Sequence, residues 1–106
     1  MATHPLDRLF EIIASRKGED PNVSYTAKLF GKGRLHCAKK LGEEGVETAL
    51  AAVAQDKADL ANESADLLYH LLVLWAVCDL TPDDVYAALA AREQRSGLDE
   101  KSSRKG

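Results

Sequence analysis

The sequence predicts an all-α fold, a helical bundle built on a central antiparallel helix hairpin and completed by dimerisation. Alanine and leucine are the most frequent residues, with 16 and 15 copies, whereas valine and isoleucine together number eight, a composition that favours helix over strand. Prolines stand only at positions 5, 21 and 82, so the interval from Asn22 to Thr81 lacks the strongest helix breaker. A chain of 106 residues can form one domain whose core is stable without disulfides.

The first predicted helix begins at Pro5, because proline fits the first helical position. Apolar residues repeat after it at three- and four-residue spacing as far as Ile13, which is the periodicity of a helix with one buried face. Residues 18–25 are mostly polar and predict a loop. A short helical turn over residues 25–30 follows, and the sequence Gly31-Lys32-Gly33 is expected to end it.

A longer helix is predicted over residues 34–53, and a tight turn at residues 54–57 leads into the next one. Asp56 is the expected N-cap of that next helix, which ends near Cys78. It is apolar nearly all round over residues 67–77, so it should lie at the centre of the bundle, with a second subunit supplying part of its cover. The predicted apolar side of the longer helix consists of Leu35, Ala38, Leu41, Val46, Ala49 and Val53.

The last helix has a clear start. Thr81 is the expected N-cap, with Pro82 at the first helical position and Asp84 at the third. This helix closes a single domain over residues 1–95. The polar residues 96–106 that follow are predicted to be a disordered tail.

Composition excludes several classes of protein. Two cysteines, Cys37 and Cys78, are too few for a secreted disulfide framework, and no basic start leads into an apolar stretch typical of a signal peptide. The longest apolar run, residues 71–78, is far shorter than the ~20 residues of a spanning helix. A net charge of −3 does not indicate a general nucleic-acid binder. We therefore expect a cytoplasmic protein with neither membrane nor nucleic acid as a partner.

The small net charge conceals a segregation of charge along the chain. No acid occurs between Asp20 and Glu43, whereas ten acids and one base, Lys57, lie from Glu43 to Asp84. A uniformly solvated surface does not require such a contrast. The bases in the acid-free interval are Lys28, Lys32, Arg34, Lys39 and Lys40.

Two pairs of carboxylates stand on consecutive predicted helices, Glu44 with Glu47 and Glu63 with Asp66. A spacing of three puts both members of a pair on one face, about one turn apart. In an antiparallel hairpin the numbers of facing residues add to a constant, and Glu47 with Glu63 gives the same total as Glu44 with Asp66. The midpoint falls in the predicted turn, so the hairpin should bring four carboxylates together across its seam.

Carboxylates gathered on partly buried faces repel one another, so a positive group is expected among them. An all-oxygen ligand set suits Mg²⁺, Mn²⁺ or Ca²⁺ rather than Zn²⁺ or Cu²⁺, and Mg²⁺ typically pairs a few carboxylates with phosphate oxygens. The upstream bases then form a surface for phosphates. Nucleotide phosphate chemistry uses these parts together with a carboxylate that activates water. The candidate phosphate-binding residues are Lys28, Lys32, Arg34 and Lys40.

Other interpretations of the acidic residues stay open at this point. Glu44 and Glu47 alone would indicate a solvated helix face, but Glu63 and Asp66 interrupt an otherwise apolar helix, and the shared register favours a metal site. His70, one turn further along that register, is expected to be a hydrogen-bonded core residue. A non-catalytic dimerisation module with an acidic face is the rival from another class. A di-iron bundle is disfavoured because its Glu-x-x-His pairs are absent.

Four stretches are shared with a known family: Ser24-Tyr25-Thr26, Lys32-Gly33, residues 40–47 (KLGEEGVE) and residues 63–74 (ESADLLYHLLVL). With them the chain resembles the phosphoribosyl-ATP pyrophosphatases, which belong to the all-α nucleoside-triphosphate pyrophosphatase superfamily that includes the MazG proteins. The resemblance extends over residues 6–92. The paired carboxylates are common to the superfamily, whereas the first and last stretches are more specific.

The resemblance implies hydrolysis of phosphoribosyl-ATP to phosphoribosyl-AMP and pyrophosphate, the second step of histidine biosynthesis, by a Mg²⁺-dependent cytoplasmic homodimer. It also implies that Glu43 and Glu47 are the catalytic candidates, Glu43 as a water activator or a residue behind the metal ligands, and that Lys40 contacts phosphate. A house-cleaning pyrophosphatase for another nucleoside triphosphate, such as dUTP, is the alternative within the same chemistry. The implied metal ligands are Glu44, Glu47, Glu63 and Asp66.

Overall fold

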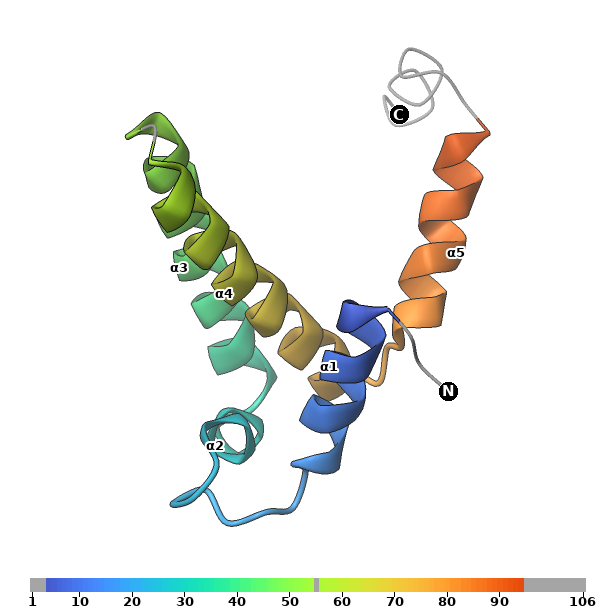
Figure 1. Ribbon diagram of the computed structural model, residues 1–106. Coiled ribbons are helices and arrows are strands. Elements are labelled where there is room, and N and C mark those ends of the chain that lie inside the picture. Colours follow the sequence, from blue (N-terminus) through green and yellow to red (C-terminus); the bar gives the residue numbers. More distant parts are fainter. Residues whose placement is uncertain (1–3, 55, 95–106) are drawn as a thin grey trace.

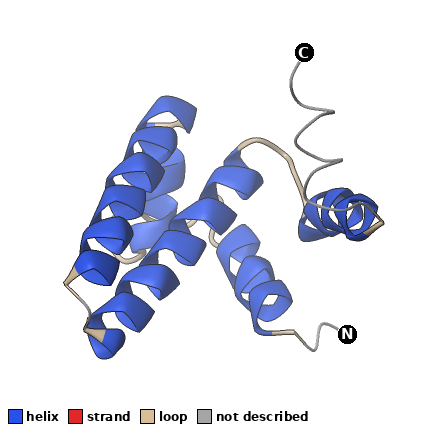
Figure 2. Cartoon of the chain, turned by 90° about the horizontal axis from the view of Figure 1, so that it is seen from above, coloured by secondary structure: helices blue, strands red, loops and turns tan. Residues whose placement is uncertain are grey.

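The computed structural model describes residues 4–54 and 56–94. Within these residues the chain forms five helices and no strand, which confirms the all-α prediction (Figures 1 and 2). The predicted tail at residues 96–106 lies outside the described residues. The helices are α1 (Pro5–Ser15), α2 (Tyr25–Lys32), α3 (Arg34–Val53), α4 (Lys57–Val77) and α5 (Pro82–Glu93).

Local capping signals explain where the two later helices begin. The Asp56 carboxylate accepts hydrogen bonds from the backbone N–H groups of Ala58 and Asp59, at 3.0 and 3.1 Å, at the start of α4. At the start of α5, the Thr81 hydroxyl accepts from the Asp84 N–H and the Asp84 carboxylate accepts from the Thr81 N–H. This capping box satisfies two backbone donors that the helix itself leaves unpaired.

The junction between α2 and α3 is shorter than the sequence predicts. We expected α2 to end at Phe30, but the helix continues to Lys32 and only Gly33 breaks it. Gly33 has a φ of 91°, in the left-handed region that favours glycine. The chain therefore passes from α2 into α3 through a single residue, and this keeps the two helices in contact.

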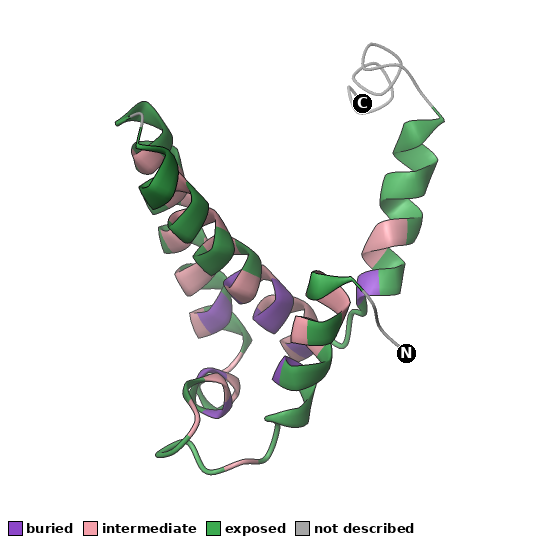
Figure 3. Ribbon diagram, viewed as in Figure 1, coloured by how far each residue is buried: buried purple, intermediate pink, exposed green. Residues whose placement is uncertain are grey.

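The hydrophobic core lies where α1, α2 and α3 meet the C-terminal half of α4 (Figure 3). α4 contacts each of these three helices, which confirms the prediction of a central helix. The α3–α4 hairpin extends beyond this core, away from α1 (Figure 1). The buried core residues are Ile13, Leu29, Cys37, Leu72, Val73 and Ala76.

Much of the apolar side predicted for α3 is exposed in the single chain. Leu35, Val46, Leu50 and Val53 are 86%, 60%, 64% and 77% exposed, and at ~100° per residue they share an arc of roughly 60°. Across the seam with α4, the Thr48 hydroxyl donates a hydrogen bond to the Glu63 carbonyl at 3.1 Å, and the Leu67 side chain lies against Gly45. We call the four exposed residues the α3 apolar strip.

The helix α5 stands apart from the α3–α4 hairpin (Figures 1 and 2). It contacts α1, where the Tyr86 hydroxyl donates a hydrogen bond to the Asp7 carboxylate at 2.9 Å. Leu89, further along α5, is 54% exposed. In the described part of the chain no single helix is long and apolar enough to span a membrane; α4 and α5 pass that test only as a pair bent by 112°.

Candidate functional site

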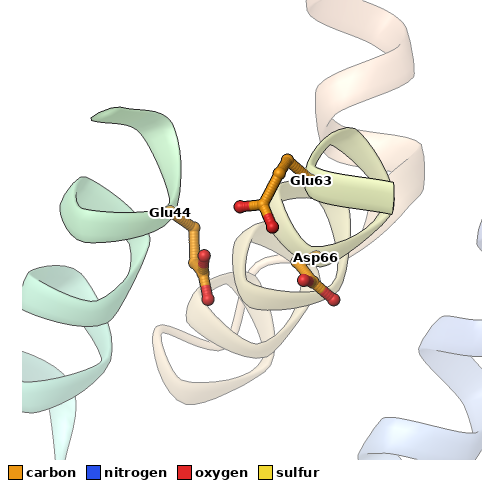
Figure 4. A group of neighbouring side chains, drawn as sticks. All are labelled: Glu44, Glu63 and Asp66. Carbon is orange, nitrogen blue, oxygen red and sulfur yellow. The ribbon is translucent and has the colours of Figure 1, made fainter. Parts of the chain in front are cut away.

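Three carboxylates meet across the seam of the α3–α4 hairpin. Carboxylate oxygens of Glu44, Glu63 and Asp66 lie within 4.8 Å of one another. Glu44 comes from α3 and the other two from α4, and Glu63 extends toward Glu44 with Asp66 beside it on the same helix (Figure 4). We call these residues the carboxylate cluster. The hairpin register expected from the sequence accounts for the meeting of Glu44 with Asp66.

The remaining predicted acids lie at the edge of this cluster or outside it. Glu47 is exposed, one turn after Glu44 on α3, and its charge acts on both Glu44 and Glu63. Glu43 is also exposed, and its Oε1 atom lies 3.4 Å from the Nζ atom of Lys40. The structure thus brings three of the four predicted ligands into one group, with the fourth beside it.

Burial and mutual repulsion raise the pKa of two acids in the cluster. The pKa of Glu44 is raised to about 7, first by the hydrogen bond that its protonated form shares with Glu47, then by burial, and then by the charges of Glu47, Asp66 and Glu63. Burial, followed by the charges of Glu47, Asp66 and Asp59, also raises the pKa of Glu63. Near neutral pH, the nearby carboxylates therefore repel one another, and no positive group in the cluster offsets this repulsion.

His70 lies behind the cluster but does not neutralise it. Its side chain is 6% exposed, and its Nε2 atom lies 3.6 Å from Oε1 of Glu44. Burial and the charge of Lys40 lower the pKa of His70 against the opposing effect of Asp66, which favours the neutral imidazole. The other oxygen of Glu44, Oε2, is buried and has no hydrogen-bond partner among the described residues.

A hard divalent cation fits this arrangement. The donors are all carboxylate oxygens, which is the chemistry that Mg²⁺, Mn²⁺ and Ca²⁺ prefer. A bound cation would give the unpaired oxygen of Glu44 a partner and would relieve the repulsion that raises the pKa of Glu44 and Glu63. The carboxylate cluster could therefore bind a metal ion.

A cavity of about 190 Å³ lies where α2 meets α3. We call it the basic pocket. Of the predicted phosphate-binding residues, Lys28, Lys32 and Lys40 line it, whereas Arg34 is exposed at the first position of α3 and does not. The full lining consists of Tyr25, Lys28, Leu29, Lys32, His36 and Lys40.

Tyr25 and His36 also line the pocket, although neither is among the predicted site residues. His36 precedes Lys40 by one helical turn, and this i, i+4 spacing was a usable signal. Tyr25 connects the pocket to the cluster: its ring meets the His70 ring edge-on, with centroids 6.2 Å apart, and stacks on Tyr69 at 6.3 Å. Thr26 holds the Tyr69 hydroxyl by a hydrogen bond. The basic pocket and the carboxylate cluster are thus linked by Tyr25 and the buried His70.

Comparison with known proteins gives one consistent result. The model of the family described as phosphoribosyl-ATP pyrophosphohydrolase matches residues 6–93. The phosphoribosyl-ATP pyrophosphatase of Parvibaculum lavamentivorans is 62% identical over 99 residues, which cover 93% of this chain and 91% of that protein. The protein of the same name from Paramagnetospirillum magneticum is 59% identical with the same coverage. That from Paracoccus denitrificans is 56% identical over 104 residues and 96% of each chain.

Proposed function

The chain belongs to the phosphoribosyl-ATP pyrophosphohydrolase family, and we propose that it hydrolyses phosphoribosyl-ATP to phosphoribosyl-AMP and pyrophosphate in the second step of histidine biosynthesis. The family match over residues 6–93 carries this proposal, and the carboxylate cluster beside a basic pocket supports it. We place the reaction in the cytoplasm, where free cysteines such as Cys37 and Cys78 are typical.

In this proposal Glu44, Glu63 and Asp66 hold Mg²⁺, with Glu47 completing the set from the edge of the cluster. The buried, unpaired oxygen of Glu44 and its raised pKa support a cation at this position. When bound, Mg²⁺ supplies positive charge that neutralises phosphate oxygens and polarises the phosphoanhydride. The protein contributes the placement of the ligands on two helices that pack against each other.

Glu47 is the proposed base for the attacking water. The water oxygen forms a bond to the α-phosphorus, the bond from that phosphorus to the bridging oxygen breaks, and the electron pair leaves with pyrophosphate. The water proton passes to the Glu47 carboxylate, which is exposed and borders the cluster. Glu43 is the alternative base, although its ion pair with Lys40 favours a role in orienting that lysine toward the leaving pyrophosphate.

A nucleotide panel tests the activity. The purified protein is incubated with Mg²⁺ and phosphoribosyl-ATP, ATP or dUTP, and pyrophosphate release is measured. We expect kcat/KM for phosphoribosyl-ATP to exceed that for the other two by about a hundredfold or more, because groups built to bind one substrate are left unpaired by another. Similar turnover of dUTP would favour a house-cleaning enzyme. Release from none of the three would favour a non-catalytic dimerisation module.

We also propose that two copies of the chain form a homodimer through the α3 apolar strip. Four large apolar residues exposed along one helix are more than a monomer usually leaves uncovered. Leu68 on α4 and Leu89 on α5 are also exposed, at 40% and 54%, so a second copy has apolar surface available on three helices. The homodimer would cover these exposed apolar residues and so complete the helical bundle.

Leu50→Asp is expected to convert the dimer into a monomer, because it places a charge in the middle of the α3 apolar strip. Light scattering after gel filtration should give twice the chain mass of 11.5 kDa for the wild type and the single-chain mass for the variant. Ala14→Asp is the matched control, since Ala14 is exposed on α1 and lies outside the strip. A wild-type protein that is monomeric at micromolar concentration would contradict the proposal.

A further inference from the structure

Resting on the proposed function, we propose that the basic pocket binds the phosphomonoester of the phosphoribosyl group and thereby distinguishes phosphoribosyl-ATP from ATP. The substrate carries phosphate at two places, a triphosphate on one ribose and a single phosphate on the other. In the proposed function, the carboxylate cluster and its Mg²⁺ bind the reacting triphosphate. The basic pocket is then available for the phosphate that does not react.

The lining of the pocket suits a phosphate dianion. Lysines reach it from two helices, Lys28 and Lys32 from α2 and Lys40 from α3, and none of its six lining residues is acidic. Among the described residues, no carboxylate lies within ion-pair distance of Lys28 or Lys32, so their charges are available to a ligand. His36 adds a ring nitrogen as a further hydrogen-bond donor. The volume of about 190 Å³ is below that of typical pockets for whole ligands and fits a sugar phosphate.

The separation between the pocket and the cluster favours a second phosphate over the leaving pyrophosphate. On α3, His36 precedes Glu44 by eight residues, which is roughly 12 Å along the helix axis. Lys40 lies halfway, one turn from Glu44, and is placed to contact pyrophosphate beside the cluster. His36 lies in the part of the pocket farther from the cluster along α3, and Lys28 and Lys32 contribute to the same pocket from α2. An extended substrate with phosphate at both ends can occupy both parts.

Tyr25 lies between the basic pocket and the residues that contact the carboxylate cluster. Its side chain lines the pocket, and its ring contacts His70, whose Nε2 atom lies 3.6 Å from Glu44. The residue is 52% exposed, so its ring is accessible to a ligand that runs from the pocket to the cluster. A nucleoside triphosphate without the second ribose phosphate would leave Lys28 and His36 without an anionic partner.

The test compares Lys28→Gln and His36→Gln with the wild type. Each variant should raise KM for phosphoribosyl-ATP by about tenfold and change kcat by less than about threefold, because a group that binds substrate and transition state equally affects KM alone. Ribose 5-phosphate should inhibit the wild type competitively and inhibit both variants at least about fivefold more weakly, as expected when a charged hydrogen bond is lost. Inhibition by pyrophosphate should not change.

Lys57→Gln is the matched control, since it removes the same charge at the start of α4, at the far end of the hairpin. It should leave kcat, KM and both inhibition constants unchanged. Variants that weaken inhibition by pyrophosphate and spare inhibition by ribose 5-phosphate would show that the pocket holds the leaving group, which overturns the proposal. A loss of kcat with an unchanged KM would overturn it as well.

A binding measurement separates failure of this proposal from failure of the proposed function. Ribose 5-phosphate is titrated into the isotope-labelled wild-type protein and followed by NMR, which requires no turnover. Shifts of the Lys28 and His36 amides that saturate, and that are lost in His36→Gln, would support the pocket even if phosphoribosyl-ATP were not hydrolysed. If phosphoribosyl-ATP is hydrolysed but ribose 5-phosphate causes no saturable shift, the pocket proposal is wrong and the activity stands.

Discussion

Glu63→Gln is expected to lower the rate of pyrophosphate release from phosphoribosyl-ATP by about a thousandfold or more and, at the same time, to make the metal-free protein more stable. Glu63 belongs to the carboxylate cluster, and an amide oxygen in its place carries no charge to hold Mg²⁺. Removal of a ligand that positions a catalytic metal costs several kcal/mol of transition-state stabilisation, and each 1.36 kcal/mol corresponds to a factor of ten in rate.

The gain in stability arises because the Glu63 charge that would hold Mg²⁺ is unfavourable when no metal is bound. Burial and the charges of Glu47, Asp66 and Asp59 raise the pKa of Glu63, which means that its ionised form is unfavourable in the folded, metal-free protein. The Glu63→Gln substitution removes that charge while keeping the shape of the side chain. The variant should therefore have a higher Tm than the wild type in EDTA at pH 8.

Glu93→Gln provides the control for both measurements, because Glu93 is exposed at the end of α5 and outside the cluster. It should change neither the rate nor the Tm in EDTA. Full activity of Glu63→Gln would contradict the metal site. A variant that loses both activity and metal-free stability would show that Glu63 supports the fold rather than a cation.

The second large effect is a stabilisation by Mg²⁺ that grows with pH. Folding raises the pKa of Glu44 from 4.5 to about 7, so between these values the folded protein binds more protons than the unfolded chain. The metal-free protein is therefore most stable below about pH 4.5 as far as Glu44 is concerned, and it loses this contribution as the pH rises through 7. After allowance for solvent screening the loss is about 1–2 kcal/mol, or several degrees in Tm for a domain of this size.

Mg²⁺ should reverse that loss because it requires the ionised ligands. At a hundredfold excess over its Kd, a ligand that binds only the folded state adds about 2.7 kcal/mol of stability. Thermal unfolding at pH 5, 6.5 and 8, with and without MgCl₂, should show a Tm increase that is smallest at pH 5. The increase should be largely absent in Glu63→Gln.

NaCl at matched ionic strength is the control for simple screening of the acidic residues. If NaCl raises Tm as much as MgCl₂ does, the cluster is an acidic surface without a metal site. A metal-free Tm that rises between pH 5 and pH 7.5 would show that Glu44 does not bind its proton more tightly in the folded protein.

The helix starts and the pairing of the two central helices can be predicted from the sequence, because they depend on residues close together in the chain. The N-cap at Asp56 and the capping box of Thr81 with Asp84 set helix starts through hydrogen bonds between near neighbours in the chain. A short turn between two long helices then leaves little freedom in their pairing. That constraint is why the meeting of Glu44 with Asp66 across the hairpin could be predicted from residue numbers alone.

The tertiary structure decided which surfaces are covered. Helical periodicity shows that Val46 and Leu50 share a face, but not whether this chain or a second one buries it, and both are exposed here. The basic pocket likewise forms between two elements, α2 and α3, which meet at Gly33 and place Tyr25 and His36 in the same lining. Periodicity within one helix carries no information about its neighbours, so contacts between elements depend on the packing of the whole chain.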